Sequence, residues 1–186
     1  LINDAHLLNE SASNCLLKTL EEPTNGLFIL LTTNINLLLE TIKSRCQQIK
    51  FHPFSNKKLI NEFQNLTHEM NHGIIETLVN ISNGSPGQLH KNLKFWKTIP
   101  ENIKNEIKYP PQEFTKALFL AKAITDELDI ALQKFILNYM QYLWWRDSHD
   151  SININILEEI QTNLKNNLSP RLSWEAGLLK IVINNK

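Results

Sequence analysis

The first fifty residues carry two kinds of apolar pattern. Leu1 to Asp4 is typical of the end of a buried strand, and Leu27 to Thr33 is a continuous apolar run of the kind found in strands buried on both faces of a parallel sheet. Cys46 to Phe51 predicts a further strand. Between the first two, a helical spacing predicts a helix with the inward-facing residues Ala12, Leu16, Leu17 and Leu20. Strands that alternate with helices indicate an α/β arrangement.

Polar residues at the expected ends support these elements. Ser11 or Ser13 can cap the first helix, and Pro23 ends it because proline restricts the residue before it. Thr24 to Gly26 predicts a turn. We expect Asn36 to cap a short helical turn that precedes the third strand.

From Ser55 onward the pattern is helical throughout. Ser55 is expected to cap a helix whose residues Leu59, Ile60 and Phe63 face inward, and a second helix is expected over residues 74–82. Gly84 then ends that helix and Pro86 opens a third. These three short helices predict a small module from about residue 55 to 98.

Longer helices follow residue 98. The apolar spacing predicts helices over residues 111–124, from Asp126 or Glu127 through Trp144, over 152–164 and from Ser169–Pro170 to about 183, which together indicate an antiparallel bundle. In Trp144-Trp145-Arg146 the apolar stripe favours packing, although stacking on a nucleic-acid base is the alternative. The whole chain is therefore expected to be mostly α.

Composition narrows the functional classes. Nineteen basic and nineteen acidic residues cancel, whereas a free-standing DNA-binding protein normally carries a basic excess. No histidine lies at metal-ligand spacing from the two cysteines, so no metal site is expected. Cys15 is predicted to be a buried thiol. A reducing, cytoplasmic setting fits this usage. The chain has no long apolar stretch and no starting methionine, so we expect a fragment of a larger protein with no membrane contact.

The most informative residue is Arg45. Ser44 and Cys46 flank it with small side chains at the mouth of the third predicted strand. An arginine held there is suited to binding phosphate, because its planar fork stays charged and donates two hydrogen bonds at once. Taken alone, a surface arginine before a strand is the simpler interpretation.

Three segments together resemble a known family. Residues 13–23, with the sequence Ser-Asn-Cys-Leu-Leu-Lys-Thr-Leu-Glu-Glu-Pro, lie about twenty residues before Ser44-Arg45-Cys46, and Gly84-Ser85-Pro86-Gly87 follows later. This set is similar to the AAA+ clamp-loader subunits of bacterial DNA polymerase III, and most of all to the delta-prime type. Residues 168–172 are a weaker likeness to the final helix of that type. The gamma/tau type shares the first two segments.

The resemblance implies an architecture and a degenerate nucleotide site. Residues 1–54 would be the C-terminal part of an AAA+ ATPase core, 55–98 a three-helix lid and 99–186 a helical collar for oligomerisation. The phosphate loop and a zinc module would lie upstream. Asn3 and Asp4 would be a degenerate Walker B pair and Thr33 of the Thr32-Thr33-Asn34 run the sensor 1 residue, both non-functional. Residues 86–88 lack the sensor 2 arginine, which argues against ATP hydrolysis by this chain itself.

The resemblance also implies a role within an assembly. Arg45, with Ser44 and Cys46 of the same motif, would be an arginine finger acting in trans on a neighbouring ATPase subunit. No cofactor would bind this fragment, since ATP and magnesium would be held by the neighbours. The partners would be the gamma/tau and delta subunits, with the sliding clamp and primed DNA reached through the complex. The whole would belong to the DNA polymerase III holoenzyme, a DNA-directed DNA polymerase and nucleotidyltransferase. An active gamma/tau-type ATPase and a purely structural collar scaffold are the alternatives.

Overall fold

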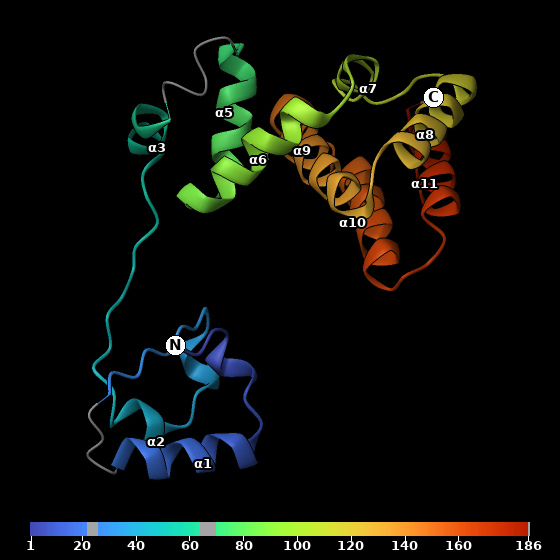
Figure 1. Cartoon of the computed structure of the whole chain (residues 1–186). Coiled ribbons are helices and arrows are strands. Elements are labelled where there is room, and N and C mark those ends of the chain that lie inside the picture. Colours follow the sequence, from blue (N-terminus) through green and yellow to red (C-terminus); the bar gives the residue numbers. More distant parts are fainter. Residues whose placement is uncertain (22–25, 64–69, 186) are drawn as a thin grey trace. The chain divides into compact units, whose positions relative to one another are not determined.

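The computed structural model describes residues 1–21, 26–63 and 70–185. These residues form two compact units, Leu1–His52 and Pro53–Lys186 (Figure 1). Helices make up most of the described residues, which confirms the expectation of a mostly α chain. The predicted turn over residues 24–26 lies largely outside the described residues.

The first unit is built on two helices. Helix α1 spans Glu10–Glu21 and packs against the short α2, Glu40–Lys43, while single 3-10 turns η1 (Ala5–Leu7) and η2 (Ile35–Leu37) connect them to the rest. Few side chains are buried here, and the apolar ones are Ala5, Leu38 and Ile42.

Two capping predictions in this unit are wrong by a few residues. Asn9 caps α1, because its Oδ1 accepts the Ala12 N–H at 2.8 Å, so Ser11 and Ser13 lie inside the helix. Asn34 caps η2, since its Oδ1 accepts the N–H of Asn36 at 3.1 Å. In both places an asparagine upstream of the expected cap satisfies the first free amide.

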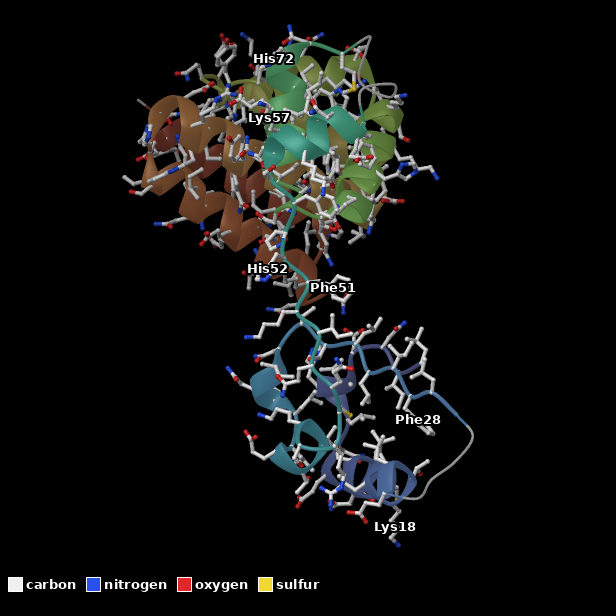
Figure 2. The ribbon with its side chains drawn as sticks, turned by 90° about the vertical axis from the view of Figure 1, so that its left-hand side faces the viewer. Lys18, Phe28, Phe51, His52, Lys57 and His72 are labelled. Atoms are coloured by element: carbon white, nitrogen blue, oxygen red, sulfur yellow. The ribbon has the colours of Figure 1, made fainter. Side chains whose placement is uncertain are left out.

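The strand predictions are wrong for the described residues, where pairing is limited to one parallel bridge. Ile2 donates to the Ile29 carbonyl at 2.8 Å and accepts from the Leu31 N–H at 2.9 Å, which pairs Ile2 with Leu30. Phe28 lies next to this bridge, and Phe51 and His52 lie on an extended segment at the end of the unit (Figure 2). Phe51 is 89% exposed. An apolar, β-prone sequence favours an extended backbone, but a sheet forms only where a neighbouring strand supplies the ladder of hydrogen bonds.

The second unit contains the longer helices. Their bounds are α3 Asn56–Glu62, α5 His72–Asn80, α6 Pro86–Thr98, α7 Glu101–Glu106, α8 Phe114–Glu127, α9 Ile130–Ser148, α10 Ser151–Lys165 and α11 Pro170–Asn184. Helix α11 packs against α8 and α10, and α10 packs against α9 (Figure 1). The antiparallel bundle expected for the last part of the chain is therefore present.

Two serine caps in this unit fall where the sequence predicts them, because Ser55 and Ser169 each accept a backbone N–H at the start of α3 and α11. Ser85, for which no cap was predicted, does the same at the start of α6. Helix α9 is the exception. It is capped by Asp129, whose carboxylate accepts the Leu132 N–H at 2.8 Å, because Asp126 and Glu127 still belong to the last turn of α8.

One continuous apolar core runs through the second unit, from Leu59 in α3 to Val182 in α11. Trp144 belongs to this core and donates its indole N–H to the Ile107 carbonyl at 3.0 Å, which confirms packing as its role. The same core joins residues on both sides of position 98, so the division into a lid and a collar stays a prediction.

A glycine permits the close approach of α10 and α11. A Cβ placed on Gly177 of α11 would lie 2.4 Å from Cδ1 and 2.5 Å from Cγ1 of Ile160 in α10. Ile160 is 1% exposed, so its side chain has little room to move away.

We therefore expect Gly177→Ala to lower the free energy of unfolding by about 1–3 kcal/mol, the usual cost of overfilling a core. Urea denaturation followed by circular dichroism measures this. Gly87→Ala is the matched control, because no atom beyond its chain neighbours and its own helix backbone lies within 4 Å of a Cβ there, so helix α6 should be unchanged or stabilised. Equal effects at the two positions would contradict the packing explanation.

Tyr139 is a buried titratable group in this core. Its ring stacks on that of Trp96 with centroids 4.6 Å apart, and its side chain is 3% exposed. Burial removes water from the phenolate and raises the pKa of Tyr139 to about 12, while the nearby Arg146 acts in the opposite direction.

A raised tyrosine pKa makes stability fall at high pH. Above the unfolded pKa, near 10, the unfolded chain loses this proton while the folded chain keeps it until about pH 12. The free energy of unfolding should thus drop by about 2–3 kcal/mol across this window, and Tyr139→Phe should remove that part of the slope. Urea titrations at several pH values test this, with Tyr142→Phe, a more exposed tyrosine, expected to change the slope less.

Candidate functional site

The turn that ends α2 positions Arg45. The Ser44 N–H donates to the Glu40 carbonyl at 2.9 Å and the Arg45 N–H donates to the Ile42 carbonyl at 3.1 Å. The Ser44 hydroxyl also donates to the Thr41 carbonyl at 3.0 Å. These short-range bonds keep residues 41–45 in one tight turn, so the backbone from which the guanidinium extends is well defined.

The guanidinium of Arg45 is held at two places. Its Nη1 donates to the Thr41 carbonyl at 3.0 Å and lies 3.5 Å from the Ser44 hydroxyl, and its Nη2 pairs with the carboxylate of Glu21 at the end of α1. The Arg45 side chain is 37% exposed and that of Glu21 is 54% exposed. The arginine is thus engaged by its own unit and still accessible from outside.

Glu21 is the residue of this site that sequence reasoning missed. The sequence places it only within residues 13–23, near the helix end predicted at Pro23. The structure instead joins that segment to Ser44-Arg45-Cys46 through a charge pair. A carboxylate at a helix C-terminus is electrostatically unfavourable, which is the sequence signal that could have indicated a cationic partner.

The two cysteines differ from expectation in one respect. Cys46, next to Arg45, is a half-buried free thiol, whereas Cys15 is exposed on α1, so the prediction that it is buried is wrong. The exposed residues Asn14 and Lys18 lie on the same part of α1. The residues that the apolar pattern places inward, Ala12, Leu16, Leu17 and Leu20, are all half-buried.

The residues proposed for the nucleotide site are brought near one another by the parallel bridge. Asn3, Asp4 and Thr33 are all exposed, and Asp4 has the left-handed backbone angle φ 49°. The side-chain contact across the bridge comes from Thr32, whose hydroxyl lies 3.2 Å from Nδ1 of His6. Neither Asn3 nor Asp4 makes the close polar contacts that mark a preformed cation site.

The turn before α6 needs a glycine because of its backbone conformation and a close contact. Asn83 and Gly84 have φ values of 49° and 76°, and the Gly84 carbonyl accepts the Phe54 N–H at 2.9 Å. A Cβ on Gly84 would lie 2.4 Å from that of Pro53, so only glycine fits. Gln88 then bonds Asn92 within α6 at 2.9 Å. The first turn of this helix has a structural role and carries no arginine.

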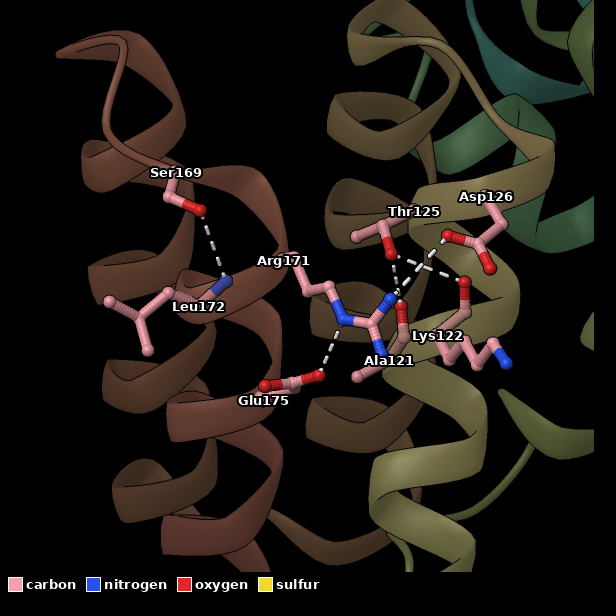
Figure 3. A network of polar contacts seen from close by, with 8 residues as sticks. All are labelled: Ala121, Lys122, Thr125, Asp126, Ser169, Arg171, Leu172 and Glu175. Atoms are coloured by element: carbon pink, nitrogen blue, oxygen red, sulfur yellow. Dashed lines mark hydrogen bonds and ion pairs between the residues drawn. The ribbon is translucent and has the colours of Figure 1, made fainter.

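A second exposed arginine lies at the start of α11. Arg171 donates to Glu175 at 2.8 Å and lies 3.8 Å from the carboxylate of Asp126 on α8 (Figure 3). The hydrogen bond to Glu175 raises the pKa of Arg171. Both carboxylates come from the same bundle, so this arginine links α11 to α8, much as Arg45 links the segment after α2 to α1.

Two further properties bear on the site. Within residues 1–21, 26–63 and 70–185, no group of three or more histidine, cysteine or acidic side chains is arranged to hold a metal ion. Among the same residues, no helix has both the length and the apolar character needed to cross a membrane.

Family comparisons agree with the resemblance in the motifs. A family model described as cyanobacterial DNA polymerase III delta prime, C-terminal domain, matches residues 55–181, and one described as DNA polymerase III, delta subunit, matches residues 1–55. The chain belongs to the family of DNA polymerase III clamp-loader subunits.

Individual relatives of this clamp-loader chain include more than one subunit type. DNA polymerase III subunit gamma of Buchnera aphidicola subsp. Baizongia pistaciae is 30% identical over 163 residues, which are 86% of this chain and 44% of that protein. Subunit delta' of Bacillus subtilis is 31% identical over 107 residues, which are 56% of this chain and 32% of that protein. Subunit tau of the same organism is 32% identical over 89 residues, 45% of this chain and 16% of its own length. The chain thus spans less than half the length of these relatives.

The exposure of the Arg45–Glu21 pair leads to a prediction about stability. Exposed ion pairs stabilise proteins by about 0–1 kcal/mol. We expect Arg45→Ala to leave hydrogen exchange of the α1 and α2 amides almost unchanged, with a change of less than about 1 kcal/mol. Ile42→Ala, which removes a side chain 1% exposed in α2, is the contrasting variant and should cost about 2–5 kcal/mol. A loss of protection in the Arg45 variant as large as in the Ile42 variant would show that the arginine is mainly structural.

Proposed function

We propose that this chain is a delta-prime-type clamp-loader subunit that presents Arg45 to an ATP molecule bound by a neighbouring ATPase subunit. The observation that carries the proposal is the state of this guanidinium. It is fixed at the Thr41 carbonyl and at Glu21, yet it is 37% exposed and stands beside small residues that leave it accessible.

Arginine suits this role for electrostatic reasons. Phosphoryl transfer spreads negative charge over the oxygens of the transferred group, and an arginine supplied from another subunit stabilises that charge. Guanidinium stays protonated at any physiological pH and donates bonds in a fixed plane, which a lysine does not do. Ser44 and Cys46 belong to the same motif and keep the space around Arg45 clear of bulky side chains.

The residues at this chain's own degenerate nucleotide site favour a role in which the chain supplies an arginine to a neighbour over a role in which it hydrolyses ATP itself. Asn3 is neutral and a poorer partner for a hard cation than a carboxylate. Thr33 would correspond to sensor 1, and the start of α6 has no arginine at the sensor 2 position. In this proposal ATP and magnesium are held by the neighbouring subunits, and this chain contributes charge to their site.

The assembly follows from the same proposal. The partners would be gamma/tau and delta subunits, with the sliding clamp and primed DNA reached through the complex. Within the second unit, residues 55–98 would form the lid and 99–186 the oligomerising collar. The work would be part of DNA replication by the DNA polymerase III holoenzyme, a DNA-directed DNA polymerase, in the cytoplasm.

An active gamma/tau-type ATPase is the second candidate, and the gamma relative that covers 86% of the chain favours it. Binding of ATP by the isolated full-length subunit separates the two, because a delta-prime-type subunit should bind it weakly or not at all. A purely structural collar would be favoured if residues 99–186 alone gave a fully active loader.

The test of Arg45 uses the reconstituted clamp loader with the full-length subunit. Arg45→Ala should lower DNA-stimulated ATP turnover at the neighbouring site by at least about a hundredfold, and Arg45→Lys should restore little of it. Arg146→Ala is the matched control, since that arginine is also 37% exposed and paired with a carboxylate, Asp147. Unchanged turnover in the Arg45 variant, with the loader intact by size-exclusion chromatography, would remove this role.

A further inference from the structure

Glu21 faces Arg45 across the packed helices of the first unit. It is the last residue of α1, whereas Arg45 follows α2, so the two side chains come from segments more than twenty residues apart. We infer that Glu21 is a positioning residue, which holds the guanidinium of Arg45 in the orientation that meets phosphate. This inference rests on the proposed function.

Holding from two sides fixes the plane of the guanidinium. The Thr41 carbonyl belongs to the backbone of α2 and takes a bond from Nη1, while the Glu21 carboxylate takes one from Nη2. A single contact would leave the long side chain free to rotate about its end. Two contacts on different nitrogen atoms restrict that rotation, so less entropy is lost when the arginine meets its ligand.

This arrangement leaves donors for a ligand. A guanidinium has five N–H groups. Among the residues the structure describes, the bonds of Arg45 involve Nη1 and Nη2 only, so the Nε–H and a second N–H of Nη2 remain for phosphate oxygens. A triphosphate can therefore bind without first displacing Glu21.

The exposure of the pair also matters. A deeply buried pair would keep the Arg45 side chain from reaching a ligand on another subunit. Here both side chains reach solvent, with Arg45 37% and Glu21 54% exposed. Such a pair is weak enough to adjust when a phosphate approaches. The effect of Glu21 on catalysis should consequently be moderate and act through Arg45.

A neighbouring pair provides a matched control. Glu40, also exposed, bonds Lys43 of the same short helix α2 at 2.6 Å. Its removal changes the net charge of the unit as removal of Glu21 does, but Glu40 has its own partner and is not bonded to Arg45.

The experiment is a double-mutant cycle in the reconstituted loader with the full-length subunit. Glu21→Ala should lower kcat for DNA-stimulated ATP hydrolysis by about twofold to fivefold and leave KM for ATP unchanged. Glu21→Gln, which keeps an acceptor oxygen and the side-chain shape, should lose less. Glu40→Ala should have no effect. In the Arg45→Ala background, Glu21→Ala should cause no further loss, because the group that it positions is gone.

Several outcomes would overturn the inference. An additive loss in the Arg45→Ala background would mean that Glu21 acts on the fold, and a rise in turnover would mean that it competes with phosphate. If turnover is unchanged in both Glu21 variants while Arg45→Ala still lowers it, the positioning role of Glu21 is refuted and the proposed role of Arg45 stands. If Arg45→Ala itself has no effect, the proposed function fails, so the two failures are distinguishable. Should Glu21→Ala not fold, Glu21→Gln in the same cycle decides the question.

Discussion

The interaction on which the functional account depends is the two-sided hold on the Arg45 guanidinium. The Thr41 carbonyl bonds one terminal nitrogen at 3.0 Å and the Glu21 carboxylate pairs with the other. Because the first contact lies within one helical turn and the second comes from α1, the position of the charge depends on the packing of α1 against α2. An arginine side chain without these two contacts would carry the same charge, but the plane of its guanidinium would not be fixed.

The two units of the chain meet different physical requirements. The first has few buried side chains, and Ala5, Leu38 and Ile42 are its buried apolar residues. Among its described residues, order depends on caps, turns, the packing of α1 against α2 and one parallel bridge. The second has a continuous core from Leu59 to Val182, with close contacts such as Gly177 against Ile160.

Sequence reasoning succeeded where the signal is local. The helices of the second unit were predicted because apolar spacing and caps such as Ser169 before Pro170 are properties of short segments. It failed where partners decide the outcome. Residues 27–33 have the composition of a strand but pair only at Leu30, and Cys15 lies on an exposed face of α1. For the site, the motif singles out Arg45, whose role stays a prediction. The carboxylate of Glu21 at a helix C-terminus indicates a cationic partner, but only the tertiary structure shows that this partner is Arg45.

The most direct measurement is a structure of the assembled clamp loader with an ATP analogue bound by the subunit next to this chain. The account predicts that a nitrogen of Arg45 lies about 2.7–2.9 Å from an oxygen of the terminal phosphate, as in charge-assisted hydrogen bonds, with Glu21 still beside the guanidinium. An Arg45 side chain that contacts only Glu21 and Thr41, with every bound phosphate beyond its reach, would contradict the account.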